Sequence, residues 1–113
     1  MALKLEDIVG LYIRDRQTQS PLKVLRQGYL TIGRAPDNDL IINDPTISSH
    51  HARIYTYLTV SYIEDLDSTN GTYVDGKRVK KHVLRPGNVI SLGGHELILE
   101  DQATPESKTA IAG

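Results

Sequence analysis

Three short segments of this 113-residue chain are rich in side chains that donate hydrogen bonds. Arg34 follows Gly33, two serines and two histidines occupy residues 48–51, and Ser-Thr-Asn-Gly-Thr occupies residues 68–72. Together the segments offer a guanidinium, several hydroxyls and an amide, with no thiol and no cluster of carboxylates. Such a set suits an anion with several acceptor oxygens better than it suits a metal ion.

Two other kinds of chemistry are open to these residues. Neighbouring residues on a strand point to opposite faces, so His50 and His51 cannot bind one metal ion together, and His82 and His95 are distant in sequence. Ser48 and His51 could form a hydrolase dyad, but the sequence has no nucleophile elbow. A small hydrolase or metalloprotein therefore stays a disfavoured alternative, and we expect no metal, no cofactor and no catalysis.

The segments around these loops have the pattern of short β-strands. We expect a turn near 57–59 and a type I′ hairpin turn at Asp75-Gly76. Loops at one end of a β-sandwich lie together, so the three polar segments can form one site. The pattern predicts an all-β sandwich, with apolar-alternating runs at 10–15, 22–26, 29–32, 40–42, 52–65, 88–92 and 96–100.

The composition narrows the class of protein. The chain has no Trp, Phe or Cys, so we expect a core of Leu, Ile, Val and the six Tyr, without disulfides. A formal net charge of −1 argues against sequence-independent nucleic-acid binding. No apolar run approaches the roughly 20 residues of a membrane span, and the acidic start is unlike a signal peptide. We expect a cytoplasmic protein that binds neither nucleic acid nor membrane.

The order and spacing of the polar segments resemble a known signature. Gly33-Arg34, Ser48-x-x-His51 and the sequence at 68–72 are similar to the motifs of forkhead-associated (FHA) domains. The resemblance covers about residues 10–100. It implies a two-sheet β-sandwich of about ten to eleven mostly antiparallel strands. We expect an FHA domain over 1–101, with its core at about 8–101, and a disordered tail or linker over 102–113.

The resemblance also implies a function, which is binding of phosphothreonine on a partner protein as an adaptor in Ser/Thr kinase signalling. A phosphothreonine carries about −1.5 to −2 charges and three strong acceptor oxygens, and an Arg fork suits it. By position, the phosphate would be held by Arg34, Ser48 and Thr69. The peptide would be held by Ser49, Asn70 and Thr46. Support for the site would come from Gly33, His51 and Gly71.

Three further expectations concern partners. The Gly93-Gly94-His95 turn is expected to border the ligand subsite at Thr46. A phosphorylated Thr104 or Thr109 would allow the domain to bind its own tail or that of a second copy. The alternative function is a structural interaction domain that uses the sandwich surface and ignores phosphate.

Overall fold

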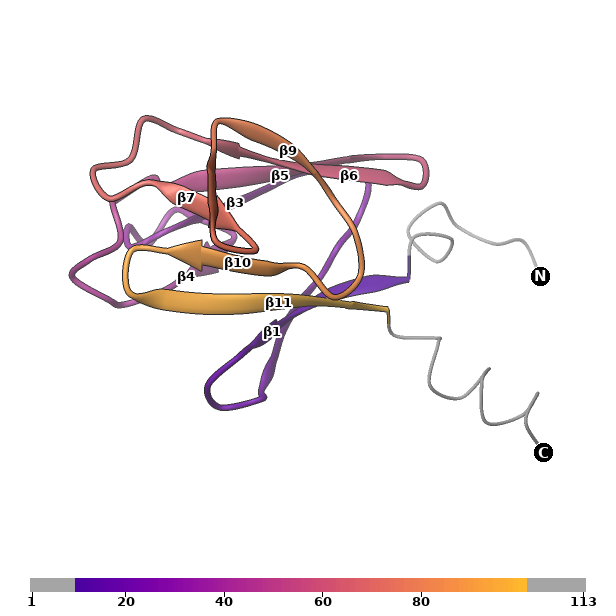
Figure 1. Ribbon diagram of the computed structural model, residues 1–113, viewed down its shortest axis with the longest axis horizontal. Helices are drawn as coiled ribbons and strands as arrows, with labels where there is room; N and C mark the ends of the chain where they lie inside the picture. The colour runs from indigo at the N-terminus through magenta and orange to yellow at the C-terminus, as the bar shows by residue number, and fades with distance from the viewer. Residues whose placement is uncertain (1–9, 102–113) are drawn as a thin grey trace.

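Residues 10–101, as the computed structural model describes them, form two packed β-sheets (Figure 1). One sheet has six strands in the order β2-β1-β11-β10-β7-β8, and the other has five in the order β4-β3-β5-β6-β9. The predicted all-β sandwich is therefore confirmed. The strands are β1 (Leu11–Asp15), β2 (Pro21–Val24), β3 (Gly28–Gly33), β4 (Leu40–Ile41), β5 (Ala52–Tyr57), β6 (Val60–Asp65), β7 (Thr72–Val74), β8 (Lys77–Val79), β9 (Lys81–Leu84), β10 (Val89–Leu92) and β11 (His95–Asp101).

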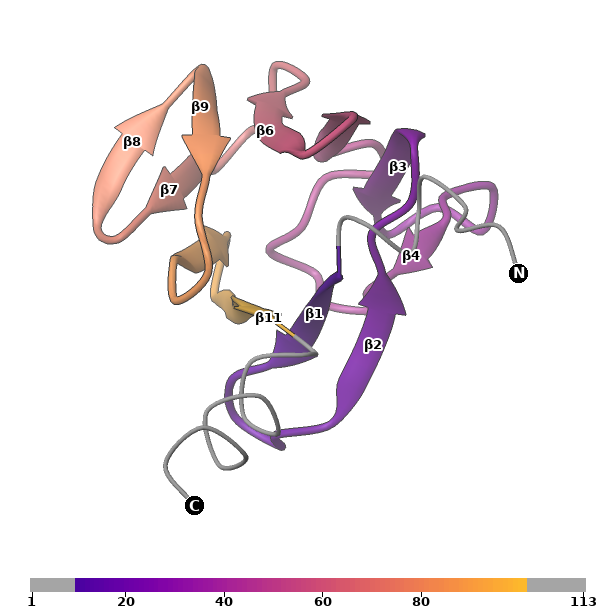
Figure 2. The ribbon, with the colours of Figure 1, turned by 90° about the vertical axis from the view of Figure 1, so that its right-hand side faces the viewer.

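The topology brings distant parts of the chain together. β1 and β11, from opposite ends of the described chain, pair antiparallel in the middle of the six-stranded sheet. β3 and β4 form a parallel pair, unlike the antiparallel pairs on either side of β5. The connections β4–β5, β6–β7 and β10–β11 lie at the left end of the sandwich in Figure 1. After β8 the chain crosses to the other sheet, so β8 and β9 lie on one side of the molecule (Figure 2).

The core between the sheets consists of aliphatic side chains. Isoleucine and leucine supply its largest fully buried residues, among them Ile13, Ile54 and Leu97. The expectation that tyrosines contribute to this core is wrong, because all six are half-buried or exposed. Strand alternation explains the difference: Tyr55 and Tyr62 neighbour Ile54 and Ile63, whose side chains take the inward positions.

Three of the six tyrosines, Tyr29, Tyr55 and Tyr62, instead form a row on the outer face of the five-stranded sheet. Tyr29 pairs with Tyr55 in the strand register, and Tyr55 pairs with Tyr62. Their ring centroids are 4.6 Å and 5.5 Å apart, respectively. Tyr57 at the end of β5 is 62% exposed. The aromatic groups thus cover a sheet face and leave the interior to aliphatic packing.

Two predicted turns are confirmed. The long run 52–65 divides into β5 and β6 at Leu58 and Thr59, where Leu58 has a φ of 56°. The Gln27 side chain supports this turn, since it donates to the Leu58 carbonyl at 2.8 Å and accepts from the Leu58 N–H at 2.7 Å. Asp75 and Gly76 both have positive φ, as a type I′ turn requires.

Other predictions are not tested by the residues that the structure describes. The expected tail over 102–113, with Thr104 and Thr109, lies outside the described residues. The domain boundaries at 1, 8 and 101 stay predictions. Within residues 10–101, no helix has the length and apolar character needed to cross a membrane.

Candidate functional site

Arg34 lies directly after β3, where the chain leaves the sheet. Its backbone N–H donates to the Ser48 carbonyl at 3.1 Å. Its Nε–H donates to the Ile47 carbonyl at 3.0 Å, although the side chain as a whole is exposed. One edge of the guanidinium is therefore anchored to the neighbouring loop, and its terminal amino groups can meet a ligand from solvent.

Ser48 joins the second polar segment to the third. The backbone N–H of Thr69 donates to the Ser48 Oγ at 3.0 Å. Nearby, the Asn70 Nδ2 donates to the Thr46 carbonyl at 2.8 Å. These two bonds connect loops that are more than twenty residues apart in sequence. The structure thus brings the segments of Arg34, Ser48 and Thr69 to one end of the sandwich.

His51 is buried beneath these loops with no exposed surface. The Ser48 N–H donates to its Nδ1 at 3.1 Å, so the ring proton must lie on Nε2. That Nε2–H donates to the Gly71 carbonyl at 2.8 Å. One neutral imidazole therefore links the loop of Ser48 to the turn at Gly71. His50, in contrast, contacts Asp37 at 2.9 Å at the surface.

The two glycines of the site allow close approach of other groups. A β-carbon on Gly33 would lie 2.2 Å from the Ser49 carbonyl oxygen. Gly71 has a φ of +86°, and a β-carbon there would lie 2.8 Å from the Arg78 Nε. A side chain at Gly33 would push the Ser49 backbone away from β3. Glycine at both positions therefore sets the shape of the loops around Arg34 and Ser48.

Thr46 holds a central position among the loops. Its hydroxyl donates to the Asp44 Oδ1 at 2.6 Å and accepts from the Gly94 N–H at 2.7 Å. A β-carbon on Gly93 would lie only 2.4 Å from the Thr46 carbonyl oxygen. The turn at 93–94 thus packs directly against Thr46. Ser49 is exposed in the same connection between β4 and β5, and its carbonyl accepts a hydrogen bond from the Ala35 N–H at 3.1 Å.

A buried carboxylate shapes the turn that carries Thr69 and Asn70. Asp65 Oδ1 accepts hydrogen bonds from the Ser68 and Thr72 hydroxyls at 2.5 Å and 2.7 Å. Burial raises the pKa of Asp65, but these hydrogen bonds outweigh it and leave the pKa below its usual range. The Ser68 hydroxyl oxygen also accepts from the Gly71 N–H at 2.9 Å. The turn is therefore fixed by an ionised group.

The comparison with protein families agrees with the geometry. A model of the FHA domain matches residues 30–93. The chain belongs to the FHA domain family. The predicted resemblance is thereby confirmed.

The chain matches part of the length of two longer relatives. The chain is 38% identical over 91 residues to the ABC transporter ATP-binding/permease protein Rv1747 of Mycobacterium tuberculosis, which covers 73% of this chain and 10% of that protein. It is 43% identical over 63 residues to FhaB of the same species, covering 55% of this chain and 41% of FhaB. The chain therefore corresponds to less than half the length of either relative.

Solved structures share the fold. An FHA domain from a structural and functional analysis of phosphothreonine-dependent FHA domain interactions superposes with a TM-score of 0.75 at 33% identity. The match covers 80% of this chain and 94% of that one.

Sequence reasoning missed several residues that shape this FHA site. Asn38 is buried, and its Nδ2 donates to the carbonyls of Ala35 and Ser49 at 2.9 Å and 2.7 Å. It ties the β3–β4 connection to the loop of Ser48. Asp65 and Ser68 were given no role from the sequence, although the Asp-x-x-Ser spacing before a turn is a recognisable local pattern. Nothing local in the sequence connects Asn38 with Ser49. Among residues 10–101, no three potential metal ligands lie close enough to hold an ion.

Proposed function

We propose that this FHA domain is a binding module for phosphothreonine on a partner protein, and not an enzyme. Arg34, Ser48 and Thr69 bind the phosphate group. The observation that carries this proposal is the Ser48 Oγ, which accepts the Thr69 N–H while Arg34 is anchored to the same loop. A guanidinium and two hydroxyl-bearing residues thus occupy one exposed end of the sandwich, and charge-assisted bonds to a phosphate are the strong class.

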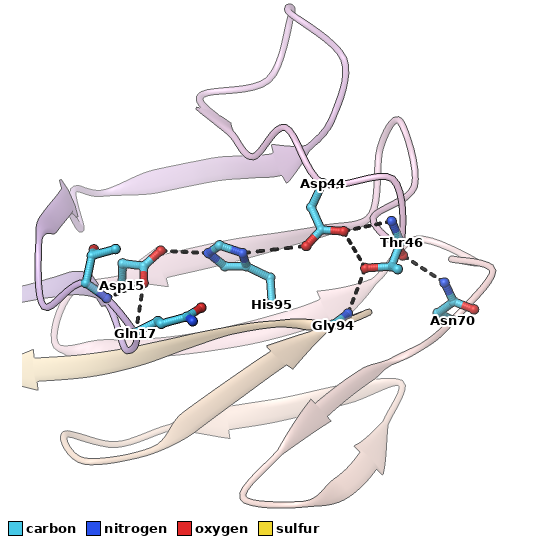
Figure 3. A network of polar contacts seen from close by, with 8 residues as sticks. Asp15, Gln17, Asp44, Thr46, Asn70, Gly94 and His95 are labelled. Carbon is cyan, nitrogen blue, oxygen red and sulfur yellow. Dashed lines mark hydrogen bonds and ion pairs between the residues drawn. The ribbon is translucent and has the colours of Figure 1, made fainter.

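The peptide on either side of the phosphothreonine is bound by Asn70, Ser49 and Thr46. An amide both donates and accepts, which suits the backbone of an extended peptide. Because the Nδ2 of Asn70 is held by Thr46, its oxygen is directed away from Thr46 (Figure 3). It is thus oriented to accept a peptide N–H. Gly33, His51 and Gly71 act by holding the loops in place.

The cellular role that follows is that of an adaptor downstream of a Ser/Thr kinase. The structure from phosphothreonine-dependent FHA interactions, at 33% identity, supports this assignment. The proposal includes a cytoplasmic location, where ATP is available to a protein kinase. It includes neither nucleic acid nor a membrane as a partner.

The test is a calorimetric titration with a phosphothreonine peptide and its phosphoserine and unmodified versions. Of the three peptides, we expect only the phosphothreonine version to bind strongly. Arg34→Ala should weaken this binding at least about tenfold, since one charge-assisted bond contributes roughly 1.5–3 kcal/mol. Arg34→Lys keeps the charge but loses the fork, and should also weaken binding. Arg85→Ala is the matched control. Arg85 lies before β10, whereas the turn at 93–94 that packs against the site follows β10, so the strand separates Arg85 from the site. Unaltered binding by Arg34→Ala would show that the site is misassigned.

A second candidate function, phosphate-independent binding through the sandwich surface, is favoured by one observation. Tyr57, Leu58 and Val60 are 62%, 46% and 50% exposed at one end of the tyrosine row. Such a surface can bind an apolar partner. A partner that binds the Arg34→Ala variant normally but not Tyr57→Ser would support this function. A phosphopeptide that raises the melting temperature of the wild type would support the first one.

Self-association through a phosphorylated tail is part of the proposal, resting on Thr104 and Thr109 in the sequence. Mass spectrometry of the protein co-expressed with a kinase, followed by size-exclusion chromatography, tests it. An unmodified tail, or a modified but monomeric protein, would contradict it.

A further inference from the structure

His95, at the start of β11, has a carboxylate on each side of its ring (Figure 3). Its Nε2 lies 2.7 Å from the Asp15 Oδ2, at the end of β1. Its Nδ1 lies 3.7 Å from the Asp44 Oδ2, in the connection between β4 and β5. The first contact is a hydrogen bond, and the second is at ion-pair distance. All three side chains are at least three-quarters buried.

The contacts continue from Asp44 to the peptide-binding side of the site. Asp44 Oδ1 accepts from both the N–H and the hydroxyl of Thr46, at 2.8 Å and 2.6 Å. The Thr46 carbonyl then accepts from the Asn70 Nδ2 at 2.8 Å. A continuous chain of polar contacts therefore joins β1 to Asn70 through His95, Asp44 and Thr46 (Figure 3).

Asp15 and Asp44, the two carboxylates in this series of contacts, are both held in their ionised form. The Thr18 N–H lowers the pKa of Asp15, and the bond with His95 adds to this effect although burial opposes it. The Thr46 hydroxyl and N–H lower the pKa of Asp44. Two other charged residues, Arg16 and Glu96, line the same surface pocket as His95, and they pair with each other at 3.0 Å. The ring therefore faces two negative charges that are not neutralised by that pair.

The number of ring protons decides whether both carboxylates are satisfied. A neutral imidazole has one N–H and can serve only one of the two, while its other nitrogen turns a lone pair toward the second carboxylate. The doubly protonated ring serves both. Histidine is also the side chain that ordinarily changes its charge between pH 5 and 8.

We propose that His95 is a positioning residue whose doubly protonated form holds Asp44 and Thr46, and thereby fixes the Asn70 amide for peptide binding. The inference deepens the proposed function and rests on it. When the ring loses its second proton, Asp44 faces a lone pair. The segment 44–46 then loses its contact with His95 and keeps the bond from the Gly94 N–H to the Thr46 hydroxyl, so the Thr46 carbonyl holds the Asn70 amide less firmly in one orientation.

The consequence is a pH dependence of phosphopeptide affinity that is separate from that of the phosphate itself. The phosphate gains its second charge near pH 6, and this contribution is the same for every variant. The ratio of wild-type to His95→Gln affinity therefore isolates the contribution of His95. Coupling between sites usually spans about 5- to 150-fold, so we expect this ratio to fall on the order of fivefold from pH 6 to pH 8.

The experiment is a calorimetric titration of one phosphothreonine peptide at several pH values between 6 and 8. Asp44→Asn should follow the pH profile of His95→Gln, because it removes the charge that the ring holds. His82→Gln is the matched control, since His82 is exposed on β9, and it should follow the wild type. A constant ratio of wild type to His95→Gln across this range would overturn the inference while leaving phosphopeptide binding intact. Failure of the wild type to bind at any pH would instead overturn the proposed function, and the inference with it.

A measurement on the free protein separates the proposed effect from a general loss of stability in the variants. In the wild type, NMR signals of the Asn70 side-chain amide should move with the titration of the His95 ring. The same amide in Asp44→Asn should be insensitive to it. Amide signals of Asn70 that do not respond to the His95 titration would contradict the proposed chain of contacts.

Discussion

A comparison of Gly33 with Gly28 can separate two effects of a glycine, the one on its own backbone conformation and the one on the geometry of the site. Its hydrogen atom faces the Ser49 carbonyl oxygen, and a β-carbon would come within 2.2 Å of that oxygen. Gly28, at the other end of β3, has a φ of +97° but nothing within 4 Å of a β-carbon. The first glycine is required by its neighbours and the second by its own backbone.

We predict that Gly33→Ala lowers the free energy of unfolding by about 1–3 kcal/mol, the usual cost of overpacking. It should also weaken phosphothreonine-peptide binding at least about tenfold, because the backbone of Ser48 and Ser49 must move. Gly28→Ala should cost about 1 kcal/mol of stability through its positive φ and leave affinity unchanged. Urea denaturation and calorimetry measure the two effects. Wild-type affinity in Gly33→Ala would contradict this account of the loop.

His51 and His95 illustrate two uses of one residue type in this molecule. His51 is fully buried and neutral, with each ring nitrogen assigned by a backbone partner. His95 lies between two carboxylates and can serve both only when it carries two ring protons. The first histidine joins two loops through its backbone partners, and the second, in our proposal, holds Asp44 through its second ring proton.

At the scale of elements, the hairpin of β5 and β6 contains a polar pair on its inward face. Thr56 and Ser61 lie opposite each other in the register, with 2% and 1% exposure. Their hydroxyl oxygens are 2.7 Å apart, so each serves as the partner of the other. Buried hydroxyls without a partner are costly, whereas replacing both is often nearly neutral.

This arrangement predicts a non-additive mutant cycle. Thr56→Val should lower the free energy of unfolding by about 1–2 kcal/mol, because it leaves the Ser61 hydroxyl unpaired. Adding Ser61→Ala should recover part of that loss. Denaturant unfolding of the two single variants and the double variant measures the coupling. Additive losses would mean that the two hydroxyls do not depend on each other.

At the scale of the whole molecule, three carboxylates link stability to pH. The pKa values of Asp15, Asp44 and Asp65 are all below the ordinary range, for the hydrogen-bonding reasons given above. A group whose folded-state pKa is depressed contributes stability above its unfolded pKa, which is about 4 for Asp. That contribution is lost as the pH falls through the folded-state pKa.

We therefore predict that the contribution of these carboxylates to the urea midpoint is lost below about pH 4. Asp65→Asn should be less stable than wild type at pH 7, by roughly 1–3 kcal/mol for disrupted bonds to a buried charged group. Its further loss on acidification should be smaller. The check is urea denaturation at pH 7, 5, 4 and 3. An Asp65→Asn variant that loses as much stability on acidification as the wild type would show that this carboxylate does not contribute.

Sequence alone was sufficient for the family, the all-β class and the position of the main turns. Strand alternation and turn chemistry act over a few residues, and the pair Asp75-Gly76 took the positive φ angles that its composition favours. The three polar segments could be grouped at one end because sandwich loops generally gather there. The tyrosines were misplaced because composition does not say which face of a strand a residue occupies.

Only the tertiary structure decided the contacts that cross the sandwich. The pairing of β1 with β11 brings Asp15 to His95, eighty residues away, and the β10–β11 turn brings Gly94 to Thr46. Sheet order and register set these contacts, and neither can be inferred from the residues nearby in sequence. Asn38 was missed for the same reason, since its partner Ser49 lies in another loop. The chemical groups that each side chain offers were known from the sequence, but the residues that surround it in space were determined by the packing of the two sheets.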